Sequence, residues 1–421
     1  MIRICRNTTK SNNAVTIAIP TSKSYSNRFL IITQVASATV SNLSISGLSE
    51  ANDTVVLQRL LAKYNTNKDS VFDCEDAGTV FRFLMAYFAM STRQTLVLTG
   101  TKRLLQRPIT PLVDALCSLG AVIDAVPDGF IIHKKKTVQY PKKISVDGKN
   151  SSQFLSALLL IAPLLTAGLQ LETQADPVSE SYINMTLQAM SAAGVDVIVR
   201  DNCYTIPPQP YHLNHFEVET DWSGAAYVYG WVLAGLVDSA FIPELNINSL
   251  QGDAAIRQYA ETLGVLTIEK ENGCSIERNY QIQAPATTTF TLKNAPDLGP
   301  LVFVMAALAN CNAIFTHCHH LALKESNRIE AMQEALAQLH ISLTYTVENG
   351  EILIARQLNE VTKINPTSIN INTKKDHRIA MACSSLVALA AVVAIDEEHV
   401  VSKSFPDFWT QWRKVGRVIE Q

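Results

Sequence analysis

A single pattern of secondary structure recurs along this chain about every 55 to 80 residues, and it constrains the fold more than any one segment does. Each unit opens with a short alternating strand, passes through a polar or glycine-containing turn, and enters an apolar helix. The helices are expected to start near Ser24, Gly78, Ser152, Ser223, Leu298 and Arg378. A generic α/β protein with irregular spacing is the alternative, but the regularity favours a repeat architecture.

Most of these units continue with a second helix, which ends on a small or glycine residue before two strands joined by a polar turn. The expected turns lie at residues 127–129, 201–202, 272–273 and 349–350. We therefore predict an α/β (α+β) protein of about six βαβαββ units, three in each of two domains. A length of 421 residues agrees with two domains of roughly 200 residues each, because a single core rarely grows larger.

The composition is that of an ordinary soluble globular protein. Hydrophobic residues make up 47% of the chain and charged residues 17%, with a net charge of −3, so neither disorder nor nucleic-acid binding is expected. The eight cysteines form no CxxC pair, which argues against a disulfide framework or a zinc ribbon and favours a reducing cytoplasm.

The N-terminus and the apolar stretches give no sign of export or of a membrane span. Residues 2–6 are expected to form a first strand, since Asn, Thr and Lys follow them in place of an apolar signal-peptide core. The stretches 154–169, 301–309 and 386–395 are too short or too interrupted to cross a bilayer, and buried helices explain them better.

Polar residues gather where the apolar helices begin, and unpaired backbone N–H groups at a helix start favour anions. Hydroxyl groups and two cations lie in segment 19–28, a glycine in segment 76–79 would let a ligand approach the backbone, and segment 150–153 opens another apolar helix. Ordinary helix capping is the alternative for each segment taken alone. The candidate residues are Lys23, Ser24, Arg28, Gly78, Ser151, Ser152 and Gln153.

Further cations follow in the second half of the chain. Lys324 and Arg328 are four residues apart, so a helix would bring both onto one face beside Glu325, although a solvated charged face would show the same spacing. Arg378 lies at the start of a helix that we expect to run to residue 395, and Lys403 follows it. A cation buried beside an apolar helix needs a partner, for which a bound anion is one candidate.

A zinc site is an alternative interpretation of segment 311–320, which contains Cys311, His317, Cys318, His319 and His320. Residues 316–320 are instead expected to alternate at the end of a strand, and no second pair of ligands has suitable spacing. We therefore expect no metal.

Together the motifs resemble the EPSP synthase family, in order and over essentially the whole chain. The matching segments are PTSKSYSNR at 20–28, DAGT at 76–79, RPI at 107–109, VDGKNSSQ at 146–153, NSLQGD at 248–253, PD at 296–297, KESNR at 324–328, DHR at 376–378 and KSFPDF at 403–408. The S-x-x-Y motif of the family is matched at Ser179 and Tyr182.

The resemblance implies two inverse α/β barrel-like domains, each of three βαβαββ repeats, with an interdomain cleft. The first domain would span 21–220, and the second would join 1–20 to 221–421, so that the first strand pairs within the second domain. The crossovers would lie near 20–23 and 219–221, and the cleft would close when the substrate binds.

The resemblance also implies an enzyme that transfers the enolpyruvyl group of phosphoenolpyruvate to the 5-hydroxyl of shikimate 3-phosphate and releases phosphate. Shikimate 3-phosphate would be held by Lys23, Ser24, Arg28, Ser151, Ser152, Gln153, Ser179, Tyr182, Asp297, His320 and Lys324. Phosphoenolpyruvate would be held by Lys23, Gly78, Arg107, Gln153, Arg328, Arg378 and Lys403. The cations among them would bind two phosphates and two carboxylates.

The implied mechanism is addition followed by elimination, which requires a base near the attacking hydroxyl and an acid near C3 of phosphoenolpyruvate. Asp297 would be the base, Lys23 would assist it, and Glu325 would carry the proton at C3. No metal or organic cofactor would be needed. We expect a cytoplasmic monomer of the shikimate pathway to chorismate and aromatic amino acids, without nucleic-acid or membrane partners.

Several positions depart from the family pattern. Thr21 replaces Gly, Asp76 replaces Asn, Phe83 replaces Pro, Asn327 replaces Asp and His320 replaces a substrate-contacting Asn. The carboxylate of Asp76 would repel phosphoenolpyruvate unless it were paired, for example with Arg82, so weaker or pH-dependent binding is expected.

Two other functions are alternatives to this one. Enolpyruvyltransferases that act on UDP-N-acetylglucosamine have the same fold, but they lack the SKS-x-SNR and DHR segments and use a loop cysteine, whereas Cys117 is expected within a helix. A catalytically inactive binding or scaffold protein could keep the fold. It is disfavoured because all the expected cations and Asp297 are present.

Overall fold

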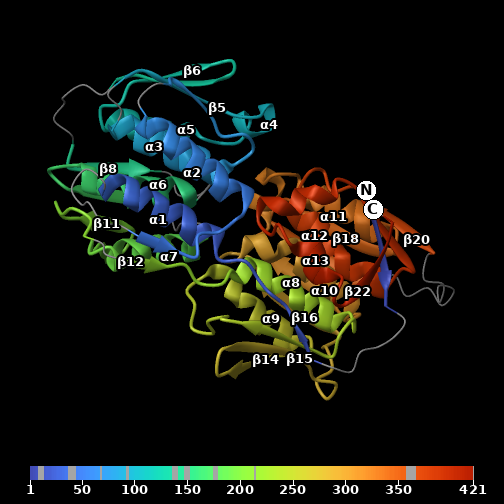
Figure 1. Cartoon of the computed structure of the whole chain (residues 1–421). Helices are drawn as coiled ribbons and strands as arrows, with labels where there is room; N and C mark the ends of the chain where they lie inside the picture. Colours follow the sequence, from blue (N-terminus) through green and yellow to red (C-terminus); the bar gives the residue numbers. More distant parts are fainter. Residues whose placement is uncertain are drawn as a thin grey trace. The chain divides into compact units, whose positions relative to one another are not determined.

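The structure is a computed structural model, and it describes residues 1–7, 14–36, 44–66, 69–91, 94–134, 141–146, 152–173, 179–212, 215–356 and 367–420. The chain divides into two compact units: in Figure 1 the continuous unit is blue to green, and the discontinuous unit is green to red with the blue N-terminal segment. The continuous unit is Thr21–Val218, and the discontinuous unit joins Met1–Pro20 to Glu219–Gln421. The chain crosses between units after Pro20 and after Val218, beside the crossovers expected at 20–23 and 219–221.

Two four-stranded sheets of the continuous unit share one topology. The first strand pairs in parallel with the second, the second pairs antiparallel with the fourth, and the fourth pairs antiparallel with the third. Since a tight turn cannot join parallel strands, a helix connects the first to the second, whereas a hairpin joins the third to the fourth. The sheets are β4 (Val71–Asp73), β5 (Leu96–Thr99), β6 (Ile123–Val126) and β7 (Gly129–Ile132), and β8 (Lys143–Val146), β9 (Leu169–Thr173), β10 (Ile198–Arg200) and β11 (Cys203–Ile206). A two-stranded sheet pairs β3 (Ser44–Ser46) in parallel with β12 (His215–Glu217).

The discontinuous unit repeats this topology in three sheets. They are β2 (Val15–Thr16), β13 (Ser239–Pro243), β14 (Val265–Lys270) and β15 (Gly273–Arg278); β16 (Thr287–Thr291), β17 (Asn312–Thr316), β18 (Ile341–Thr346) and β19 (Glu351–Arg356); and β20 (Ser368–Ile371), β21 (Val392–Ile395), β22 (Gly416–Glu420) and β1 (Ile2–Arg6). The predicted first strand is therefore confirmed. It lies between β21 and β22 and takes the place of a fourth strand.

The first helix of each repeat begins within one residue of its predicted start. These helices are α1 (Lys23–Ala36), α3 (Gly78–Ser91), α6 (Ser152–Ile161), α8 (Trp222–Leu233), α10 (Gly299–Leu308) and α12 (His377–Cys383). The second helices are α2 (Asn52–Asn65), α5 (Thr110–Ser118), α7 (Glu180–Ala192), α9 (Ile256–Thr262), α11 (Arg328–Ala337) and α13 (Phe408–Trp412). Shorter segments are α4 (Lys102–Leu105) and the 3-10 turns η1 (Ala162–Leu164), η2 (Gly252–Ala255), η3 (Pro296–Leu298), η4 (His319–Leu323), η5 (Ser384–Ala388) and η6 (Glu398–Lys403).

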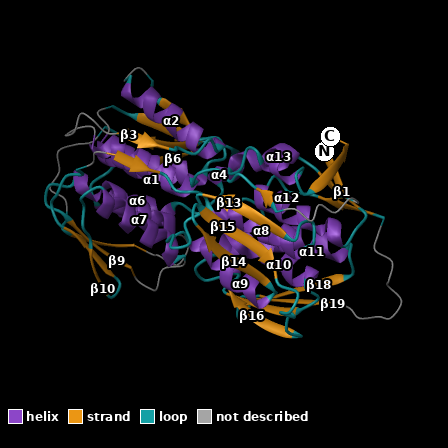
Figure 2. Ribbon diagram, turned by 60° about the horizontal axis from the view of Figure 1, so that its bottom comes forward, coloured by secondary structure: helices purple, strands orange, loops and turns teal. Residues whose placement is uncertain are grey.

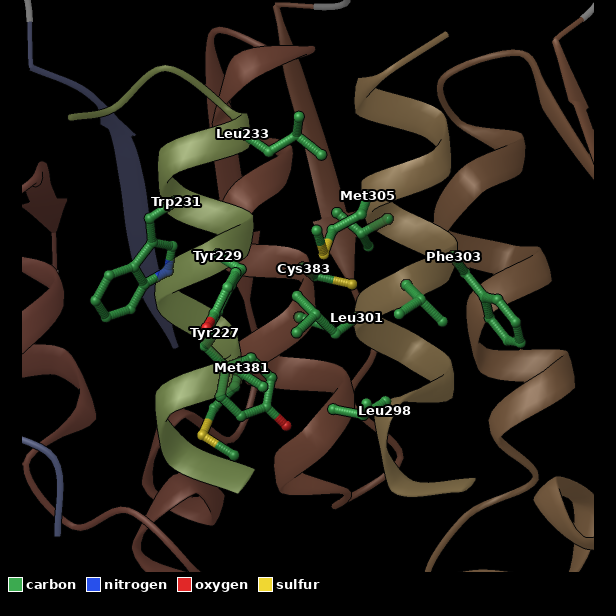
Figure 3. Close-up of a cluster of buried hydrophobic side chains, with 14 of the residues drawn as sticks. Tyr227, Tyr229, Trp231, Leu233, Leu298, Leu301, Phe303, Met305, Met381 and Cys383 are labelled. Atoms are coloured by element: carbon green, nitrogen blue, oxygen red, sulfur yellow. The ribbon is translucent and has the colours of Figure 1, made fainter. Parts of the chain in front are cut away.

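Each unit has its own hydrophobic core, built around these first helices. Figure 2 shows strands around a central group of helices in the discontinuous unit. In α8, 11 of the 12 residues are buried, as expected for a helix that is apolar on all sides. Figure 3 shows side chains of α8, α10 and α12, among them Tyr229, Leu301 and Met381, packed together between the helices. The polar groups at the helix starts are therefore held on a rigid framework.

Two of the hairpins need glycine at the same position. Gly129 and Gly273 each begin the fourth strand of a sheet, with φ of +149° and +142°. A Cβ at either residue would strike a carbonyl oxygen of the second strand, from Leu98 or Ile242. The polar turns predicted from the sequence are thus confirmed, with the glycines that the close strand approach requires.

Two predictions in the C-terminal half are wrong. The helix expected to run to residue 395 ends at Cys383, and β21 (Val392–Ile395) is a strand parallel to β20. A short, continuous apolar run fits a buried strand as well as a helix, so periodicity could not separate them. Segment 316–320 is also not an alternating strand end, since β17 ends at Thr316 and η4 follows.

The expectation that one helix carries both Lys324 and Arg328 is wrong as well. Arg328 is the first residue of α11, because the side chain of Asn327 accepts the Glu330 N–H and starts the helix there. Lys324 precedes this helix, directly after η4. Their spacing therefore does not bring the two cations together; a shared partner does, as described below.

None of the helices in the described residues has the length and hydropathy that a membrane span needs.

Candidate active site

Eight charged residues of the discontinuous unit lie together, and we call them the carboxylate–arginine cluster. They are Asp253, Asp297, Lys324, Glu325, Arg328, Asp376, Arg378 and Lys403. Asp297 lies just before α10, Arg378 lies in the first turn of α12, and Asp253 contacts Ser223 in the first turn of α8. All three repeats of this unit thus contribute to one cluster at the starts of their first helices.

Arg328 is the most deeply enclosed cation of the cluster, with 1% of its side chain exposed. Its Nε donates to Asp376 Oδ2 at 2.8 Å, its Nη1 to Asp297 Oδ1 at 2.9 Å and its Nη2 to Glu325 Oε2 at 2.7 Å. The guanidinium presents its donors in a fixed fork, so it can bind several carboxylates at once. Burial acts to lower the pKa of Arg328, but the carboxylates outweigh it and raise the pKa above its ordinary value.

Asp297 receives three cations. Its Oδ1 accepts from Arg328 and lies 3.3 Å from Lys324 Nζ, and its Oδ2 accepts from Arg378 Nη2 at 2.8 Å. Burial acts to raise the pKa of this carboxyl, but Arg378, Lys324 and Arg328 hold it well below its usual range. Asp297 is therefore ionised at neutral pH.

Asp253 is a buried carboxyl that also neighbours Arg378. Its Oδ2 accepts the Ser223 hydroxyl at 2.5 Å and lies 3.6 Å from Arg378 Nη1. Burial raises the pKa of Asp253, and Asp297 adds to the rise, while Arg378 opposes it. Two carboxyls that share one arginine thus have pKa values shifted in opposite directions, an arrangement typical of acid–base sites.

Asp376 holds the cluster together from a fully buried position, with 0% of its side chain exposed. It caps α12 by accepting the Arg378 N–H at 2.9 Å, and it also accepts the Ser326 hydroxyl at 3.0 Å beside its bond to Arg328. Neither Asp376 nor Asp253 was named as a site residue from the sequence. An Asp directly before a helix start is a capping signal that could have identified Asp376; the burial of Asp253 has no such local signal.

The first helix start of the continuous unit carries another ion pair. Lys23 begins α1, and its Nζ lies 3.1 Å from Oδ2 of Asp53 in the first turn of α2. Ser24 follows in the same turn and is half-buried. The sequence placed Lys23 and Ser24 correctly at a helix start but did not name Asp53.

Arg28 lies one turn further along α1 and is 2% exposed. Its Nε donates to Thr186 Oγ1, its Nη1 to the Ser24 carbonyl and its Nη2 to the Tyr182 carbonyl, each at 2.8 Å. Burial lowers the pKa of Arg28 to about 10. Within the described residues, the hydrogen bonds of this guanidinium go to neutral groups.

Two arginines lie against Gly78, the first residue of α3. A Cβ at this residue would meet Arg107 Nη1 and would lie 2.8 Å from Arg82 Nη1, so only glycine leaves both groups their space. Arg82 donates to the Gly78 carbonyl at 3.0 Å and to Gln153 Oε1 at 3.1 Å, and Gln153 donates to Thr79 Oγ1 at 3.1 Å. A helix start beside two guanidinium groups is suited to binding an anion.

The remaining predicted residues of the continuous unit lie at two other helix starts. Ser152 is buried as the first residue of α6, while Ser151 lies outside the described residues. Ser179 directly precedes α7 with φ of 61°, and Tyr182 is half-buried in the first turn of that helix. The predicted substrate residues of this unit that the structure describes thus lie at or near helix starts.

A sequence profile described as EPSP synthase (3-phosphoshikimate 1-carboxyvinyltransferase) matches residues 8–412. The chain belongs to the EPSP synthase family. It is 37% identical over 406 residues to the 3-phosphoshikimate 1-carboxyvinyltransferase of Bacteroides fragilis, and 29% identical over 421 residues to that of Dehalococcoides mccartyi. In both comparisons the match covers 95% of each chain.

Solved structures extend this relationship to the fold of the family. EPSP synthase from Acinetobacter baumannii matches with a TM-score of 0.74 at 19% identity, covering 100% of both chains. An enolpyruvyl transferase from Streptomyces tendae matches with a TM-score of 0.71 at 14% identity, covering 100% of this chain and 99% of the other. The α/β fold class predicted from the repeats is therefore confirmed.

The structure shows the surroundings of three residues at which the sequence departs from the expected EPSP synthase pattern. Asp76 accepts the Thr101 hydroxyl at 3.0 Å, and Asn327 caps α11 as described above. His320 lies in η4, and its buried Nε2 has no hydrogen-bond partner among the described residues. Burial lowers the pKa of His320 to about 3, with Lys324 adding to the effect and Asp297 opposing it. The imidazole is therefore neutral at neutral pH.

Within the described part of this EPSP synthase family member, no group of three or more His, Cys, Asp or Glu residues is placed to hold a metal ion.

Proposed function

We propose that this chain transfers the enolpyruvyl group of phosphoenolpyruvate to the 5-hydroxyl of shikimate 3-phosphate and releases inorganic phosphate. The carboxylate–arginine cluster is the observation that carries the proposal, together with membership of the EPSP synthase family. Its cations are held by carboxylates, and the phosphate and carboxylate groups of the substrates can replace such partners. The reaction is a step of the shikimate pathway to chorismate and aromatic amino acids.

The proposed substrate contacts involve residues of both units. Shikimate 3-phosphate is assigned to Lys23, Ser24, Arg28, Ser151, Ser152, Gln153, Ser179, Tyr182, Asp297, His320 and Lys324. Phosphoenolpyruvate is assigned to Lys23, Gly78, Arg107, Gln153, Arg328, Arg378 and Lys403. The two guanidinium groups beside Gly78 and the two that share Asp297 support the second assignment.

The chemistry needs one base and one group that donates and then takes back a proton. The 5-hydroxyl oxygen forms a bond to C2 of phosphoenolpyruvate, its proton passes to Asp297 with assistance from Lys23, and C3 receives a proton from Glu325. In the second step C3 returns its proton to Glu325, the C2–O bond to phosphate breaks, and the double bond forms again. The proton held by Asp297 passes to the leaving phosphate, so both carboxyls regain their starting state. Atoms balance without a redox or metal step.

Substrate binding itself would make Asp297 a better base. Three cations hold its pKa low in the structure, and a carboxylate held this way accepts a proton poorly. When the anionic groups of phosphoenolpyruvate take Arg328 and Arg378 as partners, less positive charge acts on Asp297 and its pKa rises. The base is thus strengthened only when the substrate is present, which is the state in which it is needed.

The organisation and location of the protein belong to the same proposal. In this proposal Thr21–Val218 forms the first enolpyruvyltransferase domain, and Met1–Pro20 with Glu219–Gln421 forms the second, two residues from the boundary expected at 220. The eight cysteines are free thiols, which supports a reducing cytoplasm. The separate hydrophobic core of each unit supports a monomer.

Phosphate release is the direct test. Purified protein is given phosphoenolpyruvate with and without shikimate 3-phosphate, and Asp297→Asn is compared with Asp238→Asn. Asp238 is a suitable control because its carboxylate also accepts a hydrogen bond, from Tyr280 at 2.6 Å, but lies outside the cluster. We expect release only with both substrates, a loss in kcat of about 10²- to 10⁴-fold in Asp297→Asn, and activity close to wild type in Asp238→Asn.

Three outcomes would contradict the proposal. Release driven by UDP-N-acetylglucosamine in place of shikimate 3-phosphate would assign a different acceptor. Tight binding of both substrates without release would indicate an inactive binding protein. Equal activity of the two variants would show that Asp297 is not the base.

A further inference from the structure

The chain passes for the second time from the continuous unit to the discontinuous unit after Val218. Between Val218 and Asp221 its backbone hydrogen bonds change from partners in the first of these units to partners in the second. On the side of the continuous unit, β12 ends at Glu217, and the Val218 N–H donates to the Ser46 carbonyl at 3.1 Å. On the side of the discontinuous unit, the Asp221 N–H donates to the Pro20 carbonyl at 2.9 Å, which ties the two crossings together. The backbone that is free to change its torsion at this crossing is therefore short.

Glu219 and Gln251 hold the segment directly after the crossing to the loop before η2; we call these contacts the crossing clamp. The half-buried Glu219 carboxylate accepts from Ser249 Oγ at 2.7 Å, from Gln251 Nε2 at 2.9 Å and from Asn246 Nδ2 at 3.2 Å. The buried Gln251 side chain also donates to the Thr220 carbonyl at 2.8 Å and accepts the Trp222 N–H at 3.1 Å. Such buried, multiply bonded side chains rigidify the backbone that they join.

The same loop leads directly into the carboxylate–arginine cluster. Gln251 precedes η2 (Gly252–Ala255), and Asp253 lies within that single turn. Asp253 contacts Ser223, one residue after Trp222, and it neighbours Arg378. A contiguous set of hydrogen bonds therefore runs from the crossing to the cluster, inside one unit.

We propose that the crossing clamp fixes the second crossing to the turn that carries Asp253, so that residues 219–224 and the carboxylate–arginine cluster behave as one rigid body. Any change of torsion at this crossing then takes place at the bonds around Val218 and Glu219, and it reaches Asp253 and Arg378 without being absorbed by the intervening loop. This inference goes beyond the proposed reaction and does not depend on it.

Hydrogen exchange of the ligand-free, full-length protein tests the clamp. In each variant the amide exchange rate is measured in the segment that the substituted side chain contacts, away from the substitution itself. This segment is residues 251–256 for Glu219→Gln and residues 219–224 for Gln251→Ala. Gln338→Ala is the matched control, because Gln338 also bridges two backbone groups, donating to the Asn370 carbonyl at 2.8 Å and accepting the Asn370 N–H at 2.9 Å. Gln338 lies outside the clamp and the cluster.

We expect exchange at the partner segment to become about five- to tenfold faster in each clamp variant, the change that the loss of a net hydrogen bond produces. Gln338→Ala should accelerate exchange only near residues 368–371. Unchanged exchange at the partner segments would overturn the proposal. Acceleration spread evenly over all peptides would overturn it too, since the clamp would then contribute only to global stability. Because no ligand is present, either result is independent of the enzymatic assay.

Discussion

Two buried arginines, one in each unit, lie near helix starts but have opposite surroundings. Arg28 lies in the second turn of α1 and Arg328 at the start of α11, with 2% and 1% exposed. Neutral oxygens of Ser24, Tyr182 and Thr186 accept from Arg28, whereas three carboxylates accept from Arg328. Accordingly, the pKa of Arg28 is lowered to about 10 and that of Arg328 is raised.

The different partners of the two arginines determine how each can bind an anion. The positive charge of Arg28 is solvated by dipoles and is not cancelled by its hydrogen-bond partners, so an anion can be attracted without displacing anything. The charge of Arg328 is cancelled by carboxylates, so an incoming anion must compete with Asp297 and Glu325. The first arrangement favours affinity. The second links binding to the protonation behaviour of the carboxylates.

Arg328→Met should have the largest effect, because it leaves three carboxylates close together without their common cation. We expect a loss of about 3–5 kcal/mol in the free energy of unfolding at pH 7, measured by chemical denaturation. The value of kcat/KM should fall by roughly a thousandfold or more. Arg328→Lys is the control that keeps the charge, and it should recover most of the stability but little of the activity, since a single ammonium cannot reproduce the fork.

Arg28→Met should be milder if the comparison is right. The change removes three hydrogen bonds but also removes a buried charge, so we expect a loss of only about 1–2 kcal/mol in the free energy of unfolding. KM for shikimate 3-phosphate should rise by roughly tenfold or more, with a smaller change in kcat. A stability loss equal to that of Arg328→Met would show that the neutral surroundings of Arg28 do not distinguish the two sites.

Asp297 and Asp253 test the electrostatics of the cluster through the pH dependence of stability. The lowered pKa of Asp297 means that folding favours its ionised form. The stabilisation that the ionised carboxylate gives is therefore fully present above the unfolded-state pKa of about 3.9, and it is lost as pH falls through the folded pKa. Asp297→Asn should therefore be about 1–3 kcal/mol less stable than wild type at pH 6, and the difference should shrink as pH falls below about 3.9. The raised pKa of Asp253 predicts the opposite sign: Asp253→Asn should be at least as stable as wild type at pH 7. Urea denaturation across this pH range measures both.

Local patterns in the sequence predicted the repeats, the helix starts and the hairpin turns, because each depends on neighbouring residues. They also singled out the four cations that the structure brings into the carboxylate–arginine cluster. The partners of those cations could not be predicted: Asp376 is 48 residues from Arg328, and Asp253 belongs to a different repeat from Arg378. The spacing of Lys324 and Arg328 suggested a shared helix face, yet it is the shared contact with Asp297 that joins them. Only the packing of the three repeats determines these pairs.

His320, at the edge of the cluster, gives a second test that depends on pH. Its pKa is lowered to about 3 by burial and by Lys324, so folding favours the neutral imidazole. The stabilisation that the neutral imidazole gives is fully present above the unfolded-state pKa of about 6.5. It is lost as pH falls toward the folded pKa, and the free energy of unfolding then changes by at most about 1.4 kcal/mol per pH unit. His320→Asn should flatten the dependence of unfolding free energy on pH between 6.5 and about 4. An unchanged slope would show that His320 does not titrate in this way.

Asp76→Asn should have the smallest effect, and it tests whether the continuous unit also carries a competing carboxylate. Asp76 lies two residues before Gly78, in the turn that enters α3, where Arg82 and Arg107 lie. An asparagine amide oxygen can still accept the Thr101 hydroxyl, so the local structure should be preserved while the negative charge is removed. We expect KM for phosphoenolpyruvate to fall by roughly two- to fivefold with kcat nearly constant, as for the loss of a solvent-screened repulsion.

Asp73→Asn is the matched control, because its carboxylate accepts the Glu75 N–H in the same turn but lies further from Gly78 along the chain. Equal changes in the two variants would mean that Asp76 acts through the general charge of this turn. A rise in KM for Asp76→Asn alone would show that its carboxylate orients the arginines and does not oppose the substrate.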